Sequence, residues 1–358
     1  MTSLVSIIIP ACNAEFTIVR CVESVLNQSW ENLEIIIIED GSKDRTGEVL
    51  RKMERIWEQQ GKTGCFKNSG RSLNILEQEN HGVSFSRHRG LELARGEYVT
   101  FLDADDYIEV DYIAAFVRAA EAEHAEVCLC GYTEVSENGE RRREHSPLDG
   151  YDRYERGTSE EYAYHMLSNC ARFYRTEFCR KHDIPMVMPG DVRGEDIPAG
   201  LRANYFCEKV CIVDQCGYYY VQRAESARHR MRGLRNYRLP LDEIESVVRE
   251  CAAEHALRTA KETSKETAEE KGHWQYFELG IVRVFITFLW DLGRGADRED
   301  KRTVFQWASR ILEDELADYK ENPKLMLLTK TKAPLHQRAA VWLFMHLFCM
   351  GSLRRHYE

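Results

Sequence analysis

The sequence predicts an α/β fold, with a mostly parallel sheet that has helices on both faces, followed by a helical C-terminal region. Short apolar, β-branched runs alternate with segments of helical periodicity between Val5 and Tyr132. Such alternation is typical of parallel strands that are joined by crossover helices. After about residue 235 the pattern becomes helical. The 358 residues suffice for roughly two domains.

The predicted elements follow one another closely along the chain. Val5–Ile9 is a buried strand that stops at Pro10, and apolar residues at helical spacing follow over 15–28. Further strands are predicted at 33–38, 73–76, 98–102 and 127–132, and helices from about 46, at 84–94 and at 111–123. We expect a surface insertion at 61–71, a polar connection at 134–149, a charged helix or linker at 258–271 and a core helix at 274–292.

Polar clusters come at the ends of three predicted strands, namely Ala11-Cys12-Asn13, Glu39-Asp40 and Asp103-Ala104-Asp105-Asp106. In a parallel sheet the carboxyl ends of the strands meet at one edge, and ligands bind there. Carboxylates two residues apart suit a hard divalent cation that also contacts a phosphorylated ligand. The alternative for the last cluster is a solvated acidic turn that caps the helix near Asp111.

Composition excludes several classes of function. The chain has a net charge of −10, which argues against nucleic acid as the main partner. No phosphate-binding G-x-x-x-x-G-K-[ST] loop and no dinucleotide-binding G-x-G-x-x-G motif is present. Cys207, Cys211 and Cys216 lack a close C-x-x-C pair, so their spacing does not favour zinc. No secretory signal or apolar run long enough to cross a bilayer is seen, so a cytoplasmic location is expected.

Several motifs, taken together in order and spacing, resemble glycosyltransferase family 2. They are the segments 5–15, 24–28, 34–44, 78–84 and 94–98, the single residues Arg87, Gly90 and Leu91, and the acidic segment 103–106. The resemblance is dense over about residues 4–113 and extends weakly to about 228. It implies the GT-A fold, a nucleoside-diphosphate sugar as donor, and a divalent metal, Mn²⁺ or Mg²⁺.

The resemblance also implies roles for individual residues in the donor half, 1–113. Pro10, Asn13 and Glu15 would line the nucleotide pocket, Asp40 would bond the base, and Arg87 would lie near the diphosphate. Asp103 would face the ribose with Ala104 beside it, and Asp105 would bind the metal together with Asp103. Cys12, Glu39 and His88 depart from residues that are common in the family, which puts the identity of the donor in doubt.

The acceptor half, 114–230, supplies Arg193-Gly194-Glu195-Asp196, which resembles the family's segment with the general base. Asp196 would take the proton of an acceptor hydroxyl. The alternative is a loop carboxylate that caps the helix through Leu201. Gly217–Val221 and Ser226 resemble the strand and turn that follow in the family. Residues 1–230 would thus form the catalytic domain and 231–358 a helical region.

The reaction implied is transfer, with inversion, of a sugar from a UDP-sugar to a glycan or lipid-linked acceptor in bacterial surface polysaccharide synthesis. One alternative is a nucleotidyltransferase, although its glycine-rich loop is missing after the first strand. The other is a catalytically silent GT-A binding module, although Asp105 and Asp196 are both present. The pattern names neither the sugar nor the acceptor, the linkage or the oligomeric state.

The apolar run 339–350 has three alternatives: a core helix, a subunit interface in a homo-oligomer, or an interfacial membrane anchor. Arg338 precedes this run, and Arg354 and Arg355 follow it. If the run is an anchor, residues 335–358 would place the protein at the inner face of the cell membrane.

Overall fold

The computed structural model of the chain describes residues 2–63, 70–145, 167–188, 192, 194–223, 240–261, 268–293, 298–316 and 322. These residues form two compact units, each built from separate stretches of chain. Unit 1 takes the described residues of Met1–Asp149, Ser168–Asp191 and Phe206–Ser226. Unit 2 takes those of Gly150–Leu167, Val192–Tyr205 and Ala227–Glu358. The domain boundary expected at residue 230 stays a prediction.

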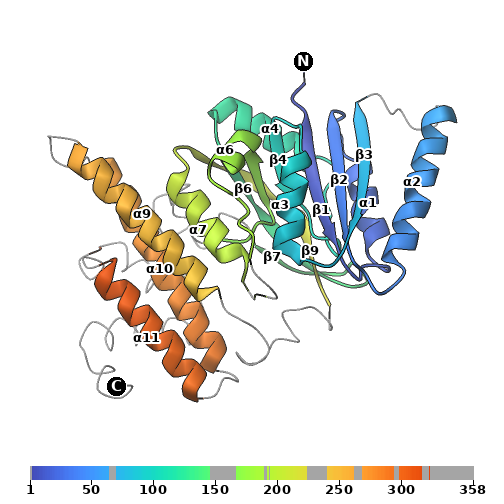
Figure 1. Cartoon of the computed structure of the whole chain (residues 1–358). Helices are drawn as coiled ribbons and strands as arrows, with labels where there is room; N and C mark the ends of the chain where they lie inside the picture. Colours follow the sequence, from blue (N-terminus) through green and yellow to red (C-terminus); the bar gives the residue numbers. More distant parts are fainter. Residues whose placement is uncertain are drawn as a thin grey trace. The chain divides into compact units, whose positions relative to one another are not determined.

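Unit 1 is built on one mixed sheet of nine strands with the order β3-β2-β1-β4-β8-β6-β9-β5 and β7 beside β6 (Figure 1). The strands are β1 (Val5–Ala11), β2 (Leu33–Asp40), β3 (Arg71–Gln78), β4 (Tyr98–Phe101), β5 (Tyr107–Ile108), β6 (Val127–Ser136), β7 (Arg141–His145), β8 (Arg172–Arg175) and β9 (Val210–Gln222). The expected parallel arrangement holds from β3 to β4. Beyond β4, strand β8 runs antiparallel to both its neighbours, while β6 and β9 are parallel.

Every residue of β1 and β2 is buried, which explains why their sequences are mostly apolar. The buried polar residues Ser6 and Glu34 bond each other at 2.8 Å. The helices of unit 1 are α1 (Ile18–Leu26), α2 (Thr46–Thr63), α3 (Val83–Leu93), α4 (Tyr112–Glu123) and α6 (Thr176–Lys181). Figure 1 shows α3 in front of the sheet and α1 behind it, so helices cover both faces as expected.

Helix α3 lies unusually close to the sheet at Gly90. A Cβ atom built on Gly90 would lie 2.4 Å from Ile8 Cγ2 in β1. No side chain fits in that space, so glycine sets the distance between α3 and β1. This close contact fixes where α3 holds Arg87 relative to the strand ends.

Two expectations for connecting segments need correction. The surface insertion expected at 61–71 is partly regular structure, because α2 continues to Thr63 and β3 begins at Arg71; residues 64–69 lie outside the described residues. The polar connection expected at 134–149 is in part a hairpin, in which β6 extends to Ser136 and pairs with β7. The exposed edge strand β7 is almost wholly polar, so it has no apolar alternation to reveal it.

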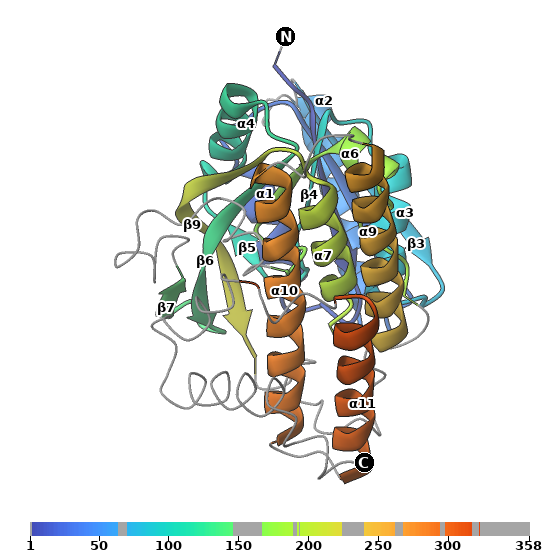
Figure 2. The same ribbon diagram turned by 90° about the vertical axis from the view of Figure 1, so that its left-hand side faces the viewer.

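Unit 2 is helical, with α7 (Asp196–Phe206), α9 (Leu241–Lys261), α10 (Ala268–Gly293) and α11 (Arg298–Asp314). Figure 2 shows the last three as long helices side by side. The core helix expected at 274–292 is confirmed as part of α10, where Phe277, Ile281 and Phe285 are fully buried. The ring of Phe285 meets that of Trp307 of α11 edge-on at 4.8 Å.

No helix among the described residues is long and apolar enough to cross a membrane. The segment 335–358, for which we expect a core, interface or anchoring role, lies outside the described residues, as do Arg193 and Ser226.

Candidate functional site

The polar clusters at the ends of β1 and β2 meet at one edge of the sheet. The strands are in register up to Ala11 and Glu39, so the loops that follow them lie together. Asn13 joins these loops, because its backbone N–H donates to Ser42 Oγ at 3.0 Å and its Oδ1 accepts from the backbone N–H of Lys43 at 2.9 Å. Its φ of 52° is left-handed, a conformation that asparagine tolerates.

Glu15 strengthens the same junction. Its Oε2 accepts hydrogen bonds from the backbone N–H of Arg45 at 3.2 Å and from Arg45 Nε at 3.1 Å. Its own N–H donates to Asp44 Oδ2 at 3.1 Å. Burial alone would raise the pKa of Asp44, but hydrogen bonds from Thr46 and from Glu15 outweigh it and hold that pKa below its ordinary value.

The carboxylate of Asp40 accepts hydrogen bonds from the turn before α3 and from the end of β3. Oδ1 accepts from Gln78 Nε2 at 2.7 Å and from the backbone N–H of His81 at 2.8 Å, and Oδ2 accepts from that of Gly82 at 2.9 Å. The residue is only 3% exposed. Asp40 therefore shapes the loop that borders the edge, and the base contact expected for it stays a prediction.

The acidic segment after β4 arrives at the same edge beside a buried arginine. Arg87 of α3 is 2% exposed, and its Nη2 donates to Asp103 Oδ1 at 2.8 Å. The other oxygen of Asp103 lies 3.1 Å from Cys170 Sγ, which donates to it. The structure thus places Arg87 in direct contact with Asp103, while the ribose and diphosphate contacts expected for them stay predictions.

Asp105 and Asp106 differ in their surroundings. Burial, and then the neighbouring charge of Asp103, raises the pKa of Asp105 to about 6. Asp106 is 1% exposed; its Oδ2 accepts from Tyr218 Oη at 2.7 Å and its Oδ1 from the backbone N–H of Val221 at 2.8 Å. Asp106 thereby ties the acidic segment to β9.

The ligand atoms of Asp103, Asp106 and Cys170 lie within 4.8 Å of one another, close enough to share a metal ion. A thiol is a soft ligand, whereas Mn²⁺ and Mg²⁺ prefer oxygen, so Cys170 does not suit a hard cation. Both oxygens of Asp106 already accept hydrogen bonds, as do both oxygens of Asp103. Asp103 and Asp105 offer carboxylate oxygens whose mutual repulsion a cation would relieve.

Comparison with known proteins places this site in a family. The sequence model described as glycosyl transferase family 2 matches residues 6–183, which include every element of the edge. The chain belongs to glycosyltransferase family 2.

Relatives of this family 2 glycosyltransferase occur in several bacteria. EpsH of Bacillus subtilis (strain 168) is 27% identical over 226 residues, which is 61% of each chain. GlyA, a glycosyltransferase of Streptococcus pneumoniae, is 31% identical over 134 residues, 37% of this chain and 17% of GlyA. The hyaluronan synthase of Pasteurella multocida is 38% identical over 110 residues, 31% of this chain and 10% of the synthase. The match thus spans about three fifths of EpsH and smaller parts of the others.

A solved structure confirms the GT-A fold. S. aureus TarS 1-349, crystallised in complex with UDP-GlcNAc, matches with a TM-score of 0.66 and 19% identity over 97% of this chain and 92% of TarS 1-349. At this identity the likeness concerns the fold alone.

Asp196, the residue expected to be the general base, belongs to unit 2. It opens α7 two residues after Gly194, which has a left-handed φ of 80°, and it is partly buried. An acidic residue in the first turn is also favoured by the helix dipole, so this position fits a structural role too. Its role in catalysis stays a prediction.

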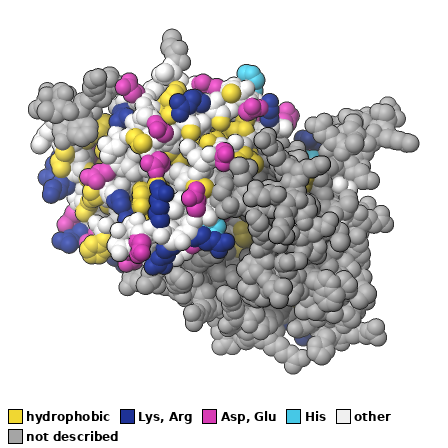
Figure 3. All heavy atoms as spheres, turned by 180° about the vertical axis from the view of Figure 1, so that it is seen from behind, with side chains coloured by type: hydrophobic (Ala, Val, Ile, Leu, Met, Phe, Trp, Pro, Cys, Tyr) yellow, Lys and Arg dark blue, Asp and Glu magenta, His cyan; other side chains and the backbone are white. Residues whose placement is uncertain are grey.

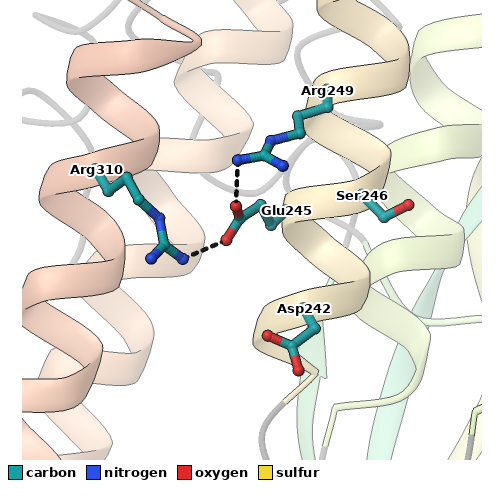
Figure 4. Close-up of a pocket in the computed structure, with 5 residues that line it drawn as sticks. All are labelled: Asp242, Glu245, Ser246, Arg249 and Arg310. Carbon is teal, nitrogen blue, oxygen red and sulfur yellow. Dashed lines mark hydrogen bonds and ion pairs between the residues drawn. The ribbon is translucent and has the colours of Figure 1, made fainter.

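Two cavities among the described residues lie away from the acidic segment. One, of about 510 Å³, borders the edge between the start of α1 and α2. The other, of about 480 Å³, lies in unit 2, where Glu245 bridges Arg249 at 2.7 Å and Arg310 at 2.5 Å (Figure 4). Neither is lined by Asp103 or Asp105, so the chemistry of the edge, rather than cavity size, identifies the candidate site.

Sequence reasoning missed Cys170, and it saw Tyr218 only as part of a family motif. Cys170 lies 67 residues from Asp103 along the chain, in a loop before the four-residue strand β8. No periodicity reports such a long-range contact. For Tyr218 the signal was present, because a tyrosine run in a buried strand requires hydroxyl partners.

Proposed function

We propose that this glycosyltransferase moves a sugar, with inversion, from a UDP-sugar to a glycan or lipid-linked acceptor in the synthesis of a bacterial surface polysaccharide. The observation that carries the proposal is the convergence of Arg87, Asp103 and Asp105 with the loops after β1 and β2. TarS was crystallised with UDP-GlcNAc, and relatives include a hyaluronan and a chondroitin synthase, which supports a nucleotide-sugar donor and a glycan product.

In the proposed donor site, Pro10, Asn13 and Glu15 line the nucleotide pocket and Asp40 bonds the base. Arg87 and Ala104 lie toward the diphosphate and ribose. Because Arg87 is buried and paired with Asp103, its guanidinium is held in place before the donor arrives. Such an arrangement stabilises the charge of the departing nucleoside diphosphate.

We propose that Asp103 and Asp105 hold Mn²⁺ or Mg²⁺, which neutralises the diphosphate when it is bound. Asp106 and Tyr218 keep the acidic segment in place, since the Asp106 carboxylate is fully engaged by β9.

For the acceptor, we propose that Asp196 takes the proton of the attacking hydroxyl. A hydroxyl is a poor nucleophile until a carboxylate within hydrogen-bond reach accepts its proton. A single carboxylate base and direct attack on the anomeric carbon lead to inversion. The catalytic domain would comprise 1–230, and its setting would be the cytoplasm or the inner face of the membrane.

A panel of nucleotide-sugars, each tested for thermal stabilisation with and without Mn²⁺, tests the proposal. We expect one UDP-sugar to raise the melting temperature only when the metal is present, and the same compound to release UDP with an acceptor. Stabilisation without any release of UDP would instead indicate a silent binding module. Release of pyrophosphate from a nucleoside triphosphate and a sugar phosphate would indicate a nucleotidyltransferase.

A further inference from the structure

A groove between the start of α1 and α2 combines basic and apolar side chains. It has a volume of about 510 Å³ and is lined by Glu15, Phe16, Arg45, Glu48, Val49, Arg51, Lys52 and Arg55. Four of these side chains are basic and two are acidic, an excess of two positive charges. The chain as a whole has a net charge of −10, so the charge of this groove is opposite in sign to that of the whole chain.

Once two ion pairs are set aside, Lys52 and Arg55 remain against the single acidic side chain of Glu48. Arg45 is paired with Glu15 at 3.1 Å, and Arg51 with Glu77 at 2.5 Å. Within the part of the chain that the structure describes, no carboxylate pairs with Lys52 or Arg55, and both are exposed. These two cations are therefore available to an anionic partner.

Two apolar side chains at the same surface are exposed to solvent. Phe16, which lines the groove, is 80% exposed, and Ile56 is 43% exposed. Val49, Lys52 and Ile56 are three and four residues apart on α2, so they share one face of the helix. Figure 3 shows basic and apolar side chains, with some acidic ones among them, along the left-hand edge of the described surface, the side of unit 1 on which α2 lies.

We propose that the surface formed by Phe16, Lys52, Arg55 and Ile56 docks on the headgroup region of an anionic lipid bilayer. Positive charges beside exposed apolar groups fit this partner, because the cations meet lipid phosphates while the apolar side chains enter the acyl boundary. A purely hydrophilic polyanion would leave Phe16 and Ile56 in water. This membrane contact does not depend on the proposed sugar transfer and is separate from the segment 335–358.

Sedimentation of the full chain with vesicles tests the proposal. The vesicles are phosphatidylglycerol and phosphatidylcholine in a ratio of about 3:7, with pure phosphatidylcholine as the neutral reference. We expect binding to the anionic vesicles only. Each cation near an anionic surface contributes a factor of about five, so Lys52→Ala with Arg55→Ala should weaken partitioning roughly 25-fold. Phe16→Ala should weaken it by about tenfold.

Matched controls remove the same groups elsewhere on unit 1. Arg118→Ala with Lys181→Ala deletes two exposed cations from α4 and α6, and Leu93→Ala deletes an apolar side chain that is 43% exposed. We expect these variants to bind vesicles like the parent. The melting temperature, measured on the same samples, should be unchanged in Lys52→Ala with Arg55→Ala, which shows that the variant is folded.

Three results would overturn the proposal. The first is that the parent chain does not sediment with anionic vesicles. The second is that Lys52→Ala with Arg55→Ala and its control, Arg118→Ala with Lys181→Ala, lose vesicle binding equally, which assigns the binding to another surface. The third is that Lys52→Ala with Arg55→Ala still binds vesicles but binds a soluble polyphosphate less tightly than the parent, which assigns the groove to a polyanionic chain. None of these results depends on whether the chain transfers a sugar.

Discussion

Arg87 carries its charge almost out of contact with water, which sets it apart from the other cations at the donor edge. It is 2% exposed, and its Nη2 bonds Asp103 Oδ1 at 2.8 Å. A charge in such a place is tolerated only while its partner remains, because desolvation costs several kcal/mol per ion. Arg87 therefore contributes to stability, and in the proposed function it also contributes to donor binding.

Replacing Arg87 with alanine should lower the free energy of unfolding by about 2 kcal/mol, since it removes a buried side chain and leaves a cavity, while the partly exposed Asp103 can turn to water. Urea unfolding measures this loss. Arg118→Ala, which removes an exposed arginine from α4, should stay within about 0.5 kcal/mol of the parent. Equal stabilities for the two variants would mean that the Arg87–Asp103 pair contributes no more than a surface charge.

At the scale of elements, the contact between α3 and β1 depends on the absence of a side chain at Gly90. Gly90→Ala should destabilise the protein by roughly 1–3 kcal/mol, because the new methyl group would collide with Ile8. Alanine is the better helix former, so propensity alone predicts the opposite sign. Thermal unfolding distinguishes the two effects.

Gly47→Ala in α2 is the matched control, because its new Cβ would meet only the flexible end of Arg51 at 3.3 Å. It should leave stability unchanged or raise it by up to about 1 kcal/mol. In a double-mutant cycle, Ile8→Ala should cost less in the Gly90→Ala background than in the parent. Simple additivity would argue against a collision between these two residues.

The link between β9 and the acidic segment yields another prediction. Tyr218→Phe removes the donor to the buried Asp106 carboxylate, so it should cost about 1–3 kcal/mol and weaken metal-dependent UDP binding. Tyr107→Phe deletes a hydroxyl that makes no hydrogen bond among the described residues, and it should have little effect. Calorimetric titration with UDP, together with chemical unfolding, would show both losses. If the two variants had equal UDP affinities and equal stabilities, Tyr218 would have no role in positioning the acidic segment.

How far the sequence predicts each element depends on its burial. The sequence predicts β1, β2, β4 and β6 because buried strands leave apolar runs. It also predicts the middle of β3 at 73–76, although β3 is only partly buried. The short strands β5 and β8 and the polar edge strand β7 leave no such pattern, since pairing and long-range contacts create them.

The features of the candidate site also differ in how far the sequence predicts them. The strand ends that carry Asn13, Asp40 and Asp103 follow from topology, so their convergence was predictable. The use of the Asp40 carboxylate by the turn at 78–82, and the arrival of Cys170 beside Asp103, depend on three-dimensional packing. These contacts could not be read from spacing along the chain.

At the scale of the whole molecule, the general base that we propose, Asp196, belongs to unit 2. Asp196→Asn should lower kcat by roughly 10²-fold or more while UDP affinity stays close to the parent value, as expected when a general base is lost. Steady-state kinetics and titration with UDP provide the two readouts. Glu195→Gln, the change at the neighbouring residue, is the control. An unchanged kcat with a collapse in UDP affinity would assign Asp196 to donor binding.

The most direct measurement is calorimetric titration of UDP into the parent chain and into Asp105→Asn, each with and without Mn²⁺. Asparagine keeps the shape of aspartate but removes a charged oxygen ligand. The parent should bind UDP more tightly when Mn²⁺ is present, and Asp105→Asn should lose that dependence while it remains folded. Equal, metal-dependent binding of UDP by both proteins would contradict a metal-assisted donor site at the ends of β1, β2 and β4.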